Sequence, residues 1–543
     1  MDRRGAGPLT GLLHHAVDGI ADRDPDRPAL THAGATVTFG DLADGIRAVA
    51  AGVAARTRPG DRVAMVGENN AAWVEAFYAV PRAGRILVFL NHRLAPAELV
   101  SILRRSGASL LAGTPEELAR LQPSIDRSAD LAGLDVVDLD GWRRLGQPPG
   151  GDHTGPADHT AGHTAGAAVT VTAADPAWII YTSGTTGSPK GAVLTHANLL
   201  ASVDASQAGR PVRDDDVYLF PFPLCHVAGY NVLRVLAAGR PVVLADRFSP
   251  EQFVELTERY GVTTTSVAAT MLSSLLDHLE DRPGDRARLS TLRSIAYGAA
   301  PMPPVLLRRA YDMLGVELAG GYGMTELAGN VAFLGPDDHR RGLAGATHLL
   351  SSAGRVAGSA EVRVVDDGGE PVPPGGQGEI VVRGPQVTVG YWDDEETTGR
   401  SFTGDWFHTG DVGVFDGDGV LSIVDRKKDV IVTGAENVSS REVEDEILRS
   451  SPEVAEVAVV GVPDARWGEN VCAVVVLRRG RTLAADVLIG RVRQSLAGFK
   501  APRHVVTVDH LPKNGTGKVV KQELRQWLAA DPAVLGHRRE VRR

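Results

Sequence analysis

Residues 181–191, with the sequence YTSGTTGSPKG, place hydroxyl groups, glycines and a lysine in one short segment that could bind a polyphosphate. Gly184 and Gly187 permit backbone angles that are closed to other residues, so that successive N–H groups could converge on an anion. Lys190 would add a mobile cation. The hydroxyl donors of the segment are Thr182, Ser183, Thr185, Thr186 and Ser188. This is not a Walker A loop, because its lysine is followed by glycine. A glycine- and threonine-rich turn between two strands is the alternative interpretation.

A second glycine-rich segment, GGYGMTE at residues 320–326, carries an aromatic ring, a hydroxyl and a carboxylate. Tyr322 could stack on a nucleotide base, Thr325 could donate to a phosphate, and Glu326 could bind Mg²⁺. A tyrosine among glycines is also common in packed turns, so this segment gains weight only in combination with other motifs.

Two further turns supply charged groups. The segment Thr409-Gly410-Asp411 presents a carboxylate that could accept hydrogen bonds from two ribose hydroxyls, although aspartates in such turns mostly serve as turn formers. The glycine-hinged segment PKNGTGK ends at Lys518, and an exposed lysine is most often only solvated. The four motifs together are far more specific than any one of them.

Cysteine and histidine residues suggest two other chemistries, and we favour neither. Cys225 precedes His226, as a thiol nucleophile might precede its base, but neighbours on a strand point to opposite faces, which places the pair badly for that role. His153, His159 and His163 are better explained as incidental residues of a solvated linker than as a metal site.

Helix-like and strand-like segments alternate through the first part of the chain. Apolar residues recur with helical spacing from Leu42 to Val53. Ser249 and Gln252 predict a helix start, with the serine as N-cap and the glutamine closing a capping box. Short apolar runs typical of buried strands occur at residues 63–66, 86–90 and 242–244. The alternation predicts an α/β fold in which helices cover parallel sheets.

The pattern changes near residues 425–429, DRKKD, into a compact helix-strand-strand-helix-strand unit. Ser439 is expected to cap its first helix, and strands are expected at residues 457–460 and 471–476. A small α+β domain of this size is reasonable.

We therefore predict two domains, residues 1–426 and residues 427–543. Within the first, residues 147–174 are rich in Gly, Pro, Thr, Ala and His and predict a flexible surface connection.

The composition of the whole chain excludes several classes of protein. The 543 residues are 43% hydrophobic and 23% charged, which is typical of a folded protein too long for one core. The net charge of -10 argues against a nucleic-acid-binding protein. No apolar stretch is long enough for integral membrane association or for a secretory leader. The 2 cysteines are too few for a disulfide framework or a zinc site, which suits the cytoplasm.

The order and spacing of YTSGTTGSPKG, GYGMTE, TGD, DRKKD and PKNGTGK resemble the adenylate-forming superfamily of acyl-CoA synthetases, nonribosomal adenylation domains and firefly-type luciferases. The resemblance extends from about Leu9 to about Trp527 and is greatest to a bacterial acyl-CoA synthetase. It implies a large N-terminal domain of helix-covered sheets and a small, mobile α+β C-terminal domain. It also implies ATP- and Mg²⁺-dependent conversion of a hydrophobic carboxylic acid into an acyl-adenylate, followed by transfer to coenzyme A.

The same resemblance assigns roles to individual residues. The segment 182–190 would wrap the β- and γ-phosphates of ATP, Tyr322 would pack on the adenine, and Asp411 and Arg426 would bind the ribose. The catalytic set would be Lys518, Glu326, Thr325 and His226, with Glu326 binding Mg²⁺, Thr325 at the α-phosphate, and Lys518 bridging the substrate carboxylate and the α-phosphate. The implied ATP- and AMP-binding positions are Thr182, Ser183, Gly184, Thr185, Thr186, Lys190, Gly298, Ala299, Ala300, Gly321, Tyr322, Gly323, Thr325, Asp411, Arg426 and Lys518.

Further positions are implied for the acid and for the thiol. Lys428 would be the hinge of the C-terminal domain, and the segment containing Gly434 and Ala435 would line the thiol tunnel. Family members usually carry a second glycine where this chain has Ala435, and the added methyl group could narrow the tunnel. The implied acyl pocket consists of His226, Val227, Tyr230, Asn231, Ala268, Ala269, Tyr297, Gly321 and Ala328. Many of these residues are small, so the pocket could admit a bulky ring system or a long chain; a packed core histidine is the alternative for His226.

Three rival interpretations stay open at this point. The enzyme could be an acyl-AMP ligase that loads a separate carrier protein, but no carrier domain follows Lys518, which favours coenzyme A as the acceptor. A non-catalytic nucleotide-binding protein is disfavoured because Lys190, Glu326 and Lys518 all keep their motif contexts. Nothing favours a luciferase-like oxygenase. A bulky acid of secondary metabolism is the expected substrate.

Overall fold

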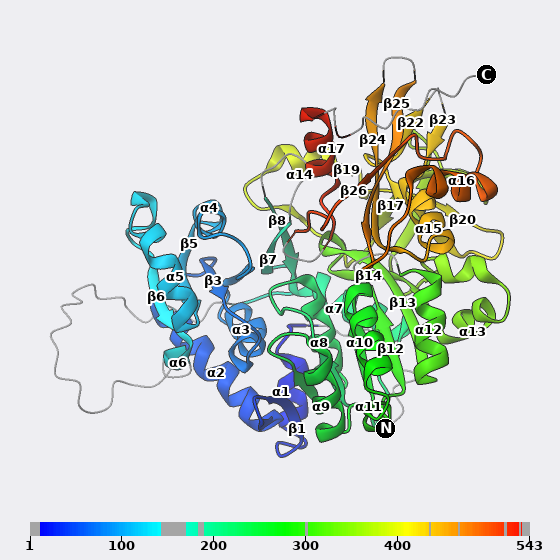
Figure 1. The fold of residues 1–543 in the computed structure, drawn as a ribbon. Helices are drawn as coiled ribbons and strands as arrows, with labels where there is room; N and C mark the ends of the chain where they lie inside the picture. Colours follow the sequence, from blue (N-terminus) through cyan, green and yellow to red (C-terminus); the bar gives the residue numbers. More distant parts are fainter. Residues whose placement is uncertain are drawn as a thin grey trace.

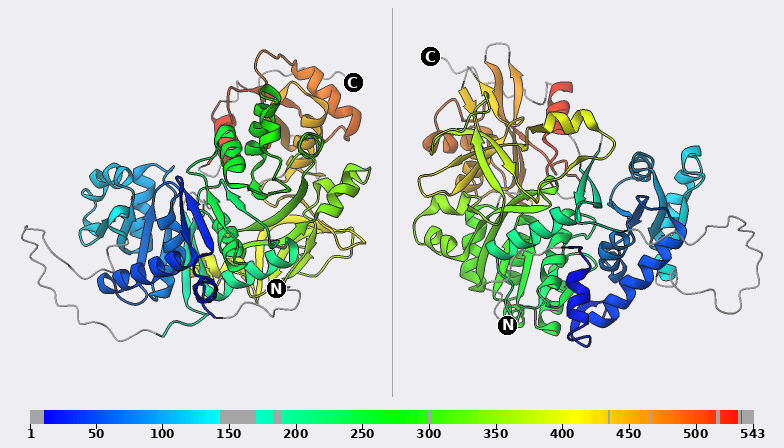
Figure 2. Two further views of the ribbon diagram at one scale, coloured as in Figure 1. Left: turned by 90° about the horizontal axis from the view of Figure 1, so that it is seen from below. Right: turned by 180° about the vertical axis from the view of Figure 1, so that it is seen from behind.

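The computed structural model describes residues 11–142, 170–182, 189–298, 302–433, 436–464, 467–514, 518–531 and 534. The chain forms a mixed α/β molecule with a large N-terminal domain and a smaller C-terminal domain that sits over one end of it (Figures 1 and 2). The predicted α/β class is therefore confirmed. Most of the expected linker, and the predicted site residues Ser183, Gly184, Thr185, Thr186, Ala299, Ala300, Gly434 and Ala435, lie outside the described residues.

One sheet of the large domain has seven strands and is parallel except at the edge formed by β8 and β18. Its strands, in spatial order, are β18 (Gly390–Tyr391), β8 (Lys190–Thr195), β7 (Pro176–Thr182), β4 (Ile86–Leu90), β3 (Arg62–Val66), β5 (Ala108–Gly113) and β6 (Asp135–Asp138). Every residue of β4 is buried, as expected for a strand covered on both faces. The helices of this region are α2 (Phe39–Arg56), α3 (Ala71–Arg82), α4 (Pro96–Ser106), α5 (Pro115–Ile125), η1 (Ala129–Leu131) and α6 (Leu139–Trp142).

A second sheet has nine strands, of which the central six run parallel. The strands are, in spatial order, β15 (Arg355–Val356), β14 (Gly329–Leu334), β13 (Glu317–Met324), β12 (Ser294–Tyr297), β11 (Thr264–Val267), β9 (Tyr218–Phe220), β10 (Val242–Leu244), β1 (Pro28–His32) and β2 (Ala35–Thr38). Its helices are α1 (His15–Ala21), α7 (His196–Gly209), η3 (Val227–Gly229), α8 (Tyr230–Ala237), α9 (Pro250–Tyr260), α10 (Ala269–Asp281), α11 (Asp285–Arg288), α12 (Pro304–Leu314), η4 (Thr325–Leu327), α13 (Pro336–Leu343) and η5 (Thr347–Ser351).

The strand register of this second sheet gathers functional candidates at one edge. Val267, Tyr297 and Gly320 pair laterally across β11, β12 and β13. Because these strands are parallel, the residues that follow them meet at the carboxyl edge, where open α/β sheets bind their ligands.

A third, antiparallel sheet completes the large domain. Its strands are β16 (Glu361–Val365), β17 (Gln377–Arg383), β20 (Trp406–Phe415), β19 (Phe402–Thr403) and β21 (Leu421–Arg426), with α14 (Glu395–Ser401) beside them. The predicted domain boundary after residue 426 coincides with the end of β21 and stays a prediction.

The C-terminal domain has its own mixed sheet and its own core. Its strands are β23 (Glu436–Val438), β22 (Ile431–Thr433), β25 (Gly468–Leu477), β24 (Val454–Asp464) and β26 (His504–Thr507), and its helices are α15 (Ser440–Ser450), α16 (Ala485–Ser495) and α17 (Lys521–Ala530). The order α15, β24, β25, α16, β26 confirms the predicted unit. Ser439 accepts from the Glu442 N–H at 3.2 Å, as an N-cap should.

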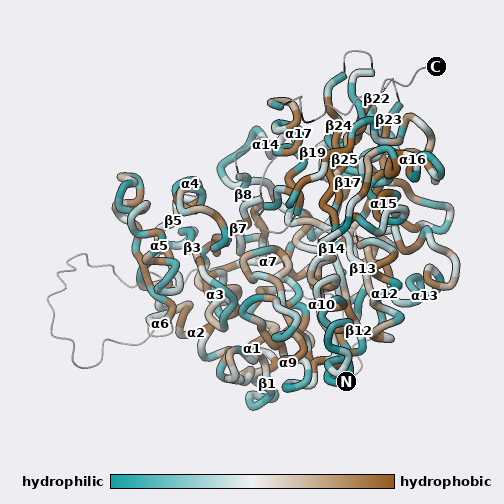
Figure 3. The backbone as a smooth tube through the Cα atoms, viewed as in Figure 1, coloured by the Kyte–Doolittle hydropathy of each residue, from teal (hydrophilic) through white to brown (hydrophobic). Residues whose placement is uncertain are grey.

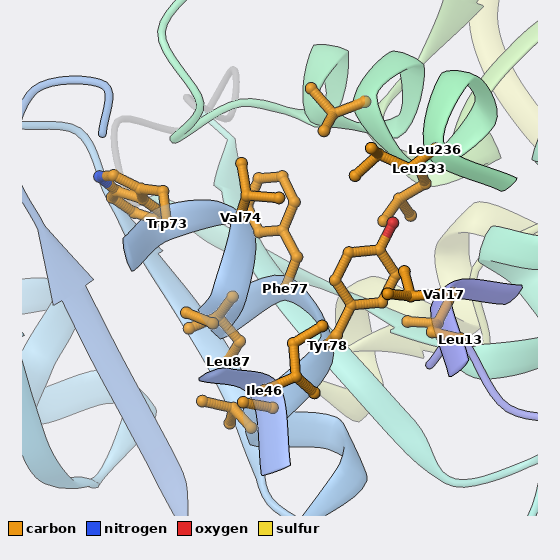
Figure 4. Packing of buried hydrophobic residues seen from close by; sticks show 14 of the residues in the cluster. Leu13, Val17, Ile46, Trp73, Val74, Phe77, Tyr78, Leu87, Leu233 and Leu236 are labelled. Carbon is orange, nitrogen blue, oxygen red and sulfur yellow. The ribbon is translucent and has the colours of Figure 1, made fainter. Parts of the chain in front are cut away.

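Helix α3 ties the two large sheets together. Phe77 stacks on Trp178 of β7 with ring centroids 4.8 Å apart, and the indole N–H of that tryptophan donates to the Phe77 carbonyl at 3.2 Å. On its other side α3 packs Tyr78 against apolar residues of α1 and α8 (Figure 4). Hydrophobic residues concentrate on the strands, and hydrophilic residues lie on outer helices and loops (Figure 3). The helices of the described ranges include none long and apolar enough to cross a membrane.

Two local predictions need correction. Ser249 caps α9 by accepting from the Gln252 N–H at 3.1 Å, but the capping box is incomplete, because Oε1 of Gln252 is buried without a hydrogen-bond partner within the described part of the chain. Cys225 and His226 lie in a turn between β9 and η3, not on a strand, so the argument from opposite strand faces was wrong.

Candidate active site

A hydrogen-bonded cluster of Tyr322, Asp411 and Arg426 forms where β13, β20 and β21 meet. Asp411 and Arg426 are cross-strand partners on β20 and β21, which brings Nε of the arginine to 2.7 Å from Oδ1 of the carboxylate. The Tyr322 hydroxyl donates to the other carboxylate oxygen at 2.7 Å. The TGD segment lies within β20 and is not the turn expected from the sequence; Gly410, with φ of +70°, permits the irregularity in the pairing of β20 with β17 at this point. Three residues that were predicted to hold a nucleoside therefore lie together.

Asp411 is 3% exposed, and its charge depends on these partners. Burial raises its pKa, while Arg426 and the Tyr322 hydrogen bond lower it. Burial and the Asp411 carboxylate in turn hold the pKa of Tyr322 well above its usual value, so the phenol stays protonated. A carboxylate has about four lone-pair directions, so Asp411 keeps acceptor capacity for ligand hydroxyls.

Glu326 and Lys190 are linked through an aromatic residue that the sequence analysis did not single out. Tyr391 of β18 donates its hydroxyl to Oε1 of Glu326 at 3.0 Å, and Nζ of Lys190 lies 5.5 Å from the centroid of its ring. Strand β18 pairs with β8, placing Tyr391 opposite Ala192 and beside the lysine. The predicted metal ligand and the predicted phosphate-binding cation thus share one neighbour.

The residues near Glu326 suit Mg²⁺ when part of its coordination comes from a ligand. Among the described residues no three His, Cys, Asp or Glu side chains cluster as a metal site would require. Mg²⁺ in nucleotide sites usually takes one or two carboxylates plus phosphate oxygens and water. Glu326 is half-buried, and Tyr391 donates to one of its oxygens. It therefore suits Mg²⁺ binding shared with a nucleotide and not a site built from protein ligands alone.

Lys518 reaches this region from the C-terminal domain. The surrounding protein lowers its pKa, Arg426 lowers it further, and Asp411 and Glu326 oppose both effects. The lysine therefore lies within electrostatic range of all three groups, although the protein leaves part of its side chain exposed. Its backbone N–H donates to Oδ1 of Asn514 at 3.0 Å.

His226 is a neutral imidazole beside the same region. Burial lowers its pKa to about 4, and the charges of Arg93, His92 and Lys518 act in the same direction. Its Nε2 atom is buried and has no hydrogen-bond partner in the ranges that the structure describes. Cys225 is 3% exposed, and burial raises its pKa to about 12, so it is a poor nucleophile.

The glycines of the GGYGMTE segment are explained by strand packing. A Cβ on Gly323 would lie 1.9 Å from the Gly329 carbonyl oxygen, and one on Gly321 would lie 2.1 Å from the Asn330 amide. Gly298 approaches Gly321 in the same way, with a hypothetical Cβ 3.2 Å from its carbonyl oxygen. These glycines let β13 and β14 approach closely just before η4, which begins at Thr325 and carries Glu326.

The predicted acyl-pocket positions fall on adjoining elements. His226 and Val227 lie at η3, Tyr230 and Asn231 open α8, and Ala268 and Ala269 follow β11. Tyr297 ends β12, and its hydroxyl hydrogen-bonds to Nε2 of His339 at 2.8 Å. Gly321 lies on β13 and Ala328 follows η4, where it is fully buried. All of these elements except η3 and α8 belong to the carboxyl edge of the nine-stranded sheet or follow it directly.

The predicted hinge residue, Lys428, is held by helix α17 of the C-terminal domain. The Lys428 carbonyl accepts from Arg525 of α17 at 3.4 Å, and the same guanidinium group binds Asp429 at 2.8 Å. Burial lowers the pKa of Lys428. Nearby, Lys427 pairs with Glu379 of the large domain at 3.2 Å.

The sequence matches known protein families and individual enzymes over nearly its whole length. Residues 17–392 match the AMP-binding enzyme family, and residues 442–518 match the C-terminal domain of AMP-binding enzymes. The chain is 38% identical over 509 residues to a feruloyl-CoA synthase of Amycolatopsis sp, which covers 93% of this chain and 97% of that protein. It is 36% identical over 523 residues to a 3-[(3aS,4S,7aS)-7a-methyl-1,5-dioxo-octahydro-1H-inden-4-yl]propanoyl:CoA ligase of Mycobacterium tuberculosis, covering 94% and 98%.

Solved structures resemble the whole chain. The o-succinylbenzoate CoA synthetase MenE from Bacillus subtilis, in complex with its acyl-adenylate intermediate, superposes with a TM-score of 0.79 at 30% identity, covering 95% of this chain and 99% of MenE. The amide bond synthetase McbA from Marinactinospora thermotolerans gives a TM-score of 0.82 at 32% identity, with the same two coverages.

Proposed function

The chain belongs to the AMP-binding enzyme family, and we propose from this premise that it is an AMP-forming ligase that joins a hydrophobic carboxylic acid to coenzyme A. ATP and the acid first give an acyl-adenylate and pyrophosphate, and the thiol of coenzyme A then displaces AMP. The observation that carries the proposal is the cluster of Tyr322, Asp411 and Arg426, in which the tyrosine hydroxyl and the arginine Nε each lie 2.7 Å from the carboxylate.

The cations of this site offset the electrostatic repulsion that opposes the first step. A carboxylate and a triphosphate are both anions, so their approach and the charge that grows at the α-phosphate require cations. Lys518 supplies one at the reacting groups, and Lys190 supplies one toward the pyrophosphate. Removal of one such transition-state contact typically costs about 3–4 kcal/mol. Asp411 and Arg426 hold the ribose, and Tyr322 packs on the adenine.

Glu326 is the residue that would hold Mg²⁺. When bound, the ion offsets phosphate charge. Tyr391 orients the carboxylate through its hydroxyl, which donates to Oε1. Thr325, the first residue of η4, precedes Glu326 and donates to the α-phosphate.

The acid is a hydrophobic one that carries a ring. Support comes from the relatives, whose names include feruloyl-CoA synthase, indoleacetate–CoA ligase and 2-succinylbenzoate–CoA ligase. Several predicted pocket residues are small, among them Ala268, Ala269 and Gly321, which leaves room for a ring system. Burial keeps His226 neutral, so that its imidazole does not compete with Lys518 for the carboxylate.

The second step requires the C-terminal domain to move. Lys428 is the hinge, and rotation there withdraws Lys518 and brings the segment of Gly434 and Ala435 to the thiol route. The hydrogen bonds that Ser440 of α15 donates to Asp425 of β21, from its backbone N–H and from its hydroxyl, are among the contacts that such a rotation must break. The enzyme works in the cytoplasm, where ATP and coenzyme A are available, and secondary metabolism is a fitting source of its acid.

A carrier protein is the alternative thiol acceptor. A fatty acid–[acyl-carrier-protein] ligase, ScoC of Streptomyces coeruleorubidus, is 34% identical to this chain over 520 residues. Thioester formation with coenzyme A, measured beside a panel of pantetheinylated carrier proteins, separates the two. Coenzyme A is expected to be the better acceptor, and exclusive transfer to a carrier would overturn that choice.

Acid-dependent exchange of labelled pyrophosphate into ATP tests the adenylation itself. The panel contains ring-bearing, fatty and terpenoid acids, and at least one ring-bearing acid should support exchange that requires Mg²⁺. A protein that binds ATP but supports no exchange with any of these acids would be a non-catalytic nucleotide-binding protein.

A further inference from the structure

A polar cluster adjoins two of the predicted acyl-pocket residues and has no part in the adenylation chemistry. Arg210, directly after α7, donates from Nη2 to Oδ1 of Asn231 at 2.7 Å and from Nη1 to Oγ of Ser266 at 3.0 Å. The Tyr218 hydroxyl donates to the same Ser266 oxygen at 2.8 Å. Asn231 is a pocket position itself, and Ser266 lies two residues before the pocket position Ala268. The cluster thus borders the pocket on α8 and on β11.

A second guanidinium group lies behind the first. Arg234 of α8 is 2% exposed and donates from Nη1 to the carbonyl oxygen of Arg210 at 2.9 Å. Its Nε atom is buried without a hydrogen-bond partner in the described part of the chain. Asp216, the nearby acid, is already engaged by Arg293 at 2.8 Å. Within the part of the chain that the structure describes, neither Arg210 nor Arg234 forms an ion pair with a carboxylate.

Arg234 is buried and Arg210 is half-buried, and the acceptors of both guanidinium groups are neutral oxygens, which is an unusual arrangement. Buried charges are normally paired, because removal of an ion from water costs several kcal/mol unless an opposite charge or strong acceptors replace the water. Asn231 and Ser266 supply Arg210 with neutral oxygens only. The planar guanidinium fork binds carboxylate and carbonyl oxygens well, so an acceptor on a ligand would complete the cluster.

We propose that Arg210 binds an oxygen acceptor, a keto group or a second carboxylate, at the end of the acid remote from the carboxylate that is activated. The proposal rests on the proposed function and narrows its substrate class to ring-bearing acids with such a distal oxygen. Arg234 acts behind it as a positioning residue, holding the Arg210 backbone through the carbonyl and adding positive potential. The rival explanation is that Arg210 merely joins α7, α8 and β11, in which case the substrate would not sense it.

Matched acids distinguish these explanations. Two acid frames are used, benzoate and 3-phenylpropanoate, and each is prepared with hydrogen, acetyl or carboxylate in the para position. The two frames place the para group at two different distances from the carboxylate that is activated. Adenylation is followed as pyrophosphate release at saturating ATP, and kcat/KM is compared within each frame. On at least one frame the wild type should favour an oxygen-bearing acid by about 10- to 100-fold, the range for a hydrogen bond to a charged group. The acetyl and carboxylate acids separate a neutral from an anionic acceptor.

The variants Arg210→Met and Arg210→Lys are measured with the same acids. In Arg210→Met, the kcat/KM of the oxygen-bearing acid divided by that of the unsubstituted acid should fall to about one. In Arg210→Lys, part of this preference should remain. Because both acids are assayed on one preparation, a lower folded fraction leaves the ratio unchanged. Arg213→Met is the matched control, since Arg213 is half-exposed and pairs with Glu317 at 2.6 Å; it should keep the wild-type ratio.

Parity in the wild type on both frames, or an unchanged ratio in Arg210→Met, would overturn this inference and leave the adenylation proposal standing. Absence of pyrophosphate release with these six acids and with the wider panel would overturn both.

Discussion

The link between Tyr391 and Glu326 yields a prediction that the sequence alone did not suggest. The substitution Tyr391→Phe removes one oxygen atom and keeps the ring that lies 5.5 Å from the Lys190 ammonium group. The lost contact is the 3.0 Å hydrogen bond from the phenol to Oε1 of Glu326. Because the phenylalanine ring has the same shape, the variant isolates the orientation of the carboxylate proposed to hold Mg²⁺.

The magnitude follows from the charge of the acceptor and its surroundings. A hydrogen bond to a charged group contributes about 1.5–3 kcal/mol. Glu326 and Tyr391 are half-buried, so water replaces part of the lost bond and the lower half of that range applies. A loss of about 1.5–2 kcal/mol lowers kcat/KM by about 10- to 30-fold.

The assay is acid-dependent pyrophosphate exchange at several Mg²⁺ concentrations. The apparent Mg²⁺ requirement should rise in Tyr391→Phe, while the KM for the acid changes little, since Tyr391 is not among the predicted acyl-pocket positions. Tyr311→Phe, at a tyrosine 38% exposed on the surface, serves as control and should behave as wild type.

A double-mutant cycle with Glu326→Gln gives the decisive comparison. If the hydroxyl acts through the carboxylate, Tyr391→Phe should have little additional effect when Glu326 is already replaced. A full 10-fold effect in the Glu326→Gln background, or a Mg²⁺ requirement unchanged in the single variant, would refute this reasoning.

Three further outcomes are expected. Asp411→Asn, which removes the charge facing Arg426 at 2.7 Å, should raise the KM for ATP by about 10-fold or more while the acid KM stays within about threefold; equal rises in both would contradict the ribose assignment. His196 is 0% exposed, and burial lowers its pKa to about 4, so the unfolded chain binds more protons than the folded chain between pH 6.5 and 4. The free energy of unfolding therefore falls as the pH falls through that window. In His196→Gln this fall, measured by urea unfolding at several pH values, should be smaller by about 2–3 kcal/mol. Gly323→Ala puts a Cβ 1.9 Å from the Gly329 carbonyl oxygen and should cost at least about 2 kcal/mol of stability; a melting temperature equal to wild type would show that β13 and β14 can separate.

Local patterns in the sequence predicted much of the fold. The helical spacing from Leu42 to Val53 falls within α2, and the apolar runs at residues 86–90 and 242–244 coincide with β4 and β10. Such elements follow from residue periodicity and from short-range caps. The incomplete capping box at Gln252 shows the limit, because its side chain is buried by tertiary packing that no local pattern encodes.

The site was predictable only where a motif carried several functional groups. The resemblance implied that Asp411 and Arg426 act as a ribose-binding pair, but their position as cross-strand partners on β20 and β21 comes from the structure alone. Tyr391 is 65 residues from Glu326 in sequence and belongs to a two-residue strand, so its role depends on sheet pairing alone. Arg210 belongs to no motif, and the sequence cannot show that it lacks a carboxylate partner among the described residues.

The central claim is that Lys518 acts on the reacting groups and not on nucleotide affinity. Pyrophosphate exchange by Lys518→Ala, measured beside the ATP dissociation constant of the same variant, tests it most directly. Lys513→Ala is the control, because Lys513 belongs to the same PKNGTGK motif but pairs with Glu456 at 2.6 Å. Exchange should fall at least about 100-fold in Lys518→Ala while ATP binding weakens less than about 10-fold. Exchange near the wild-type rate in that variant would contradict the account.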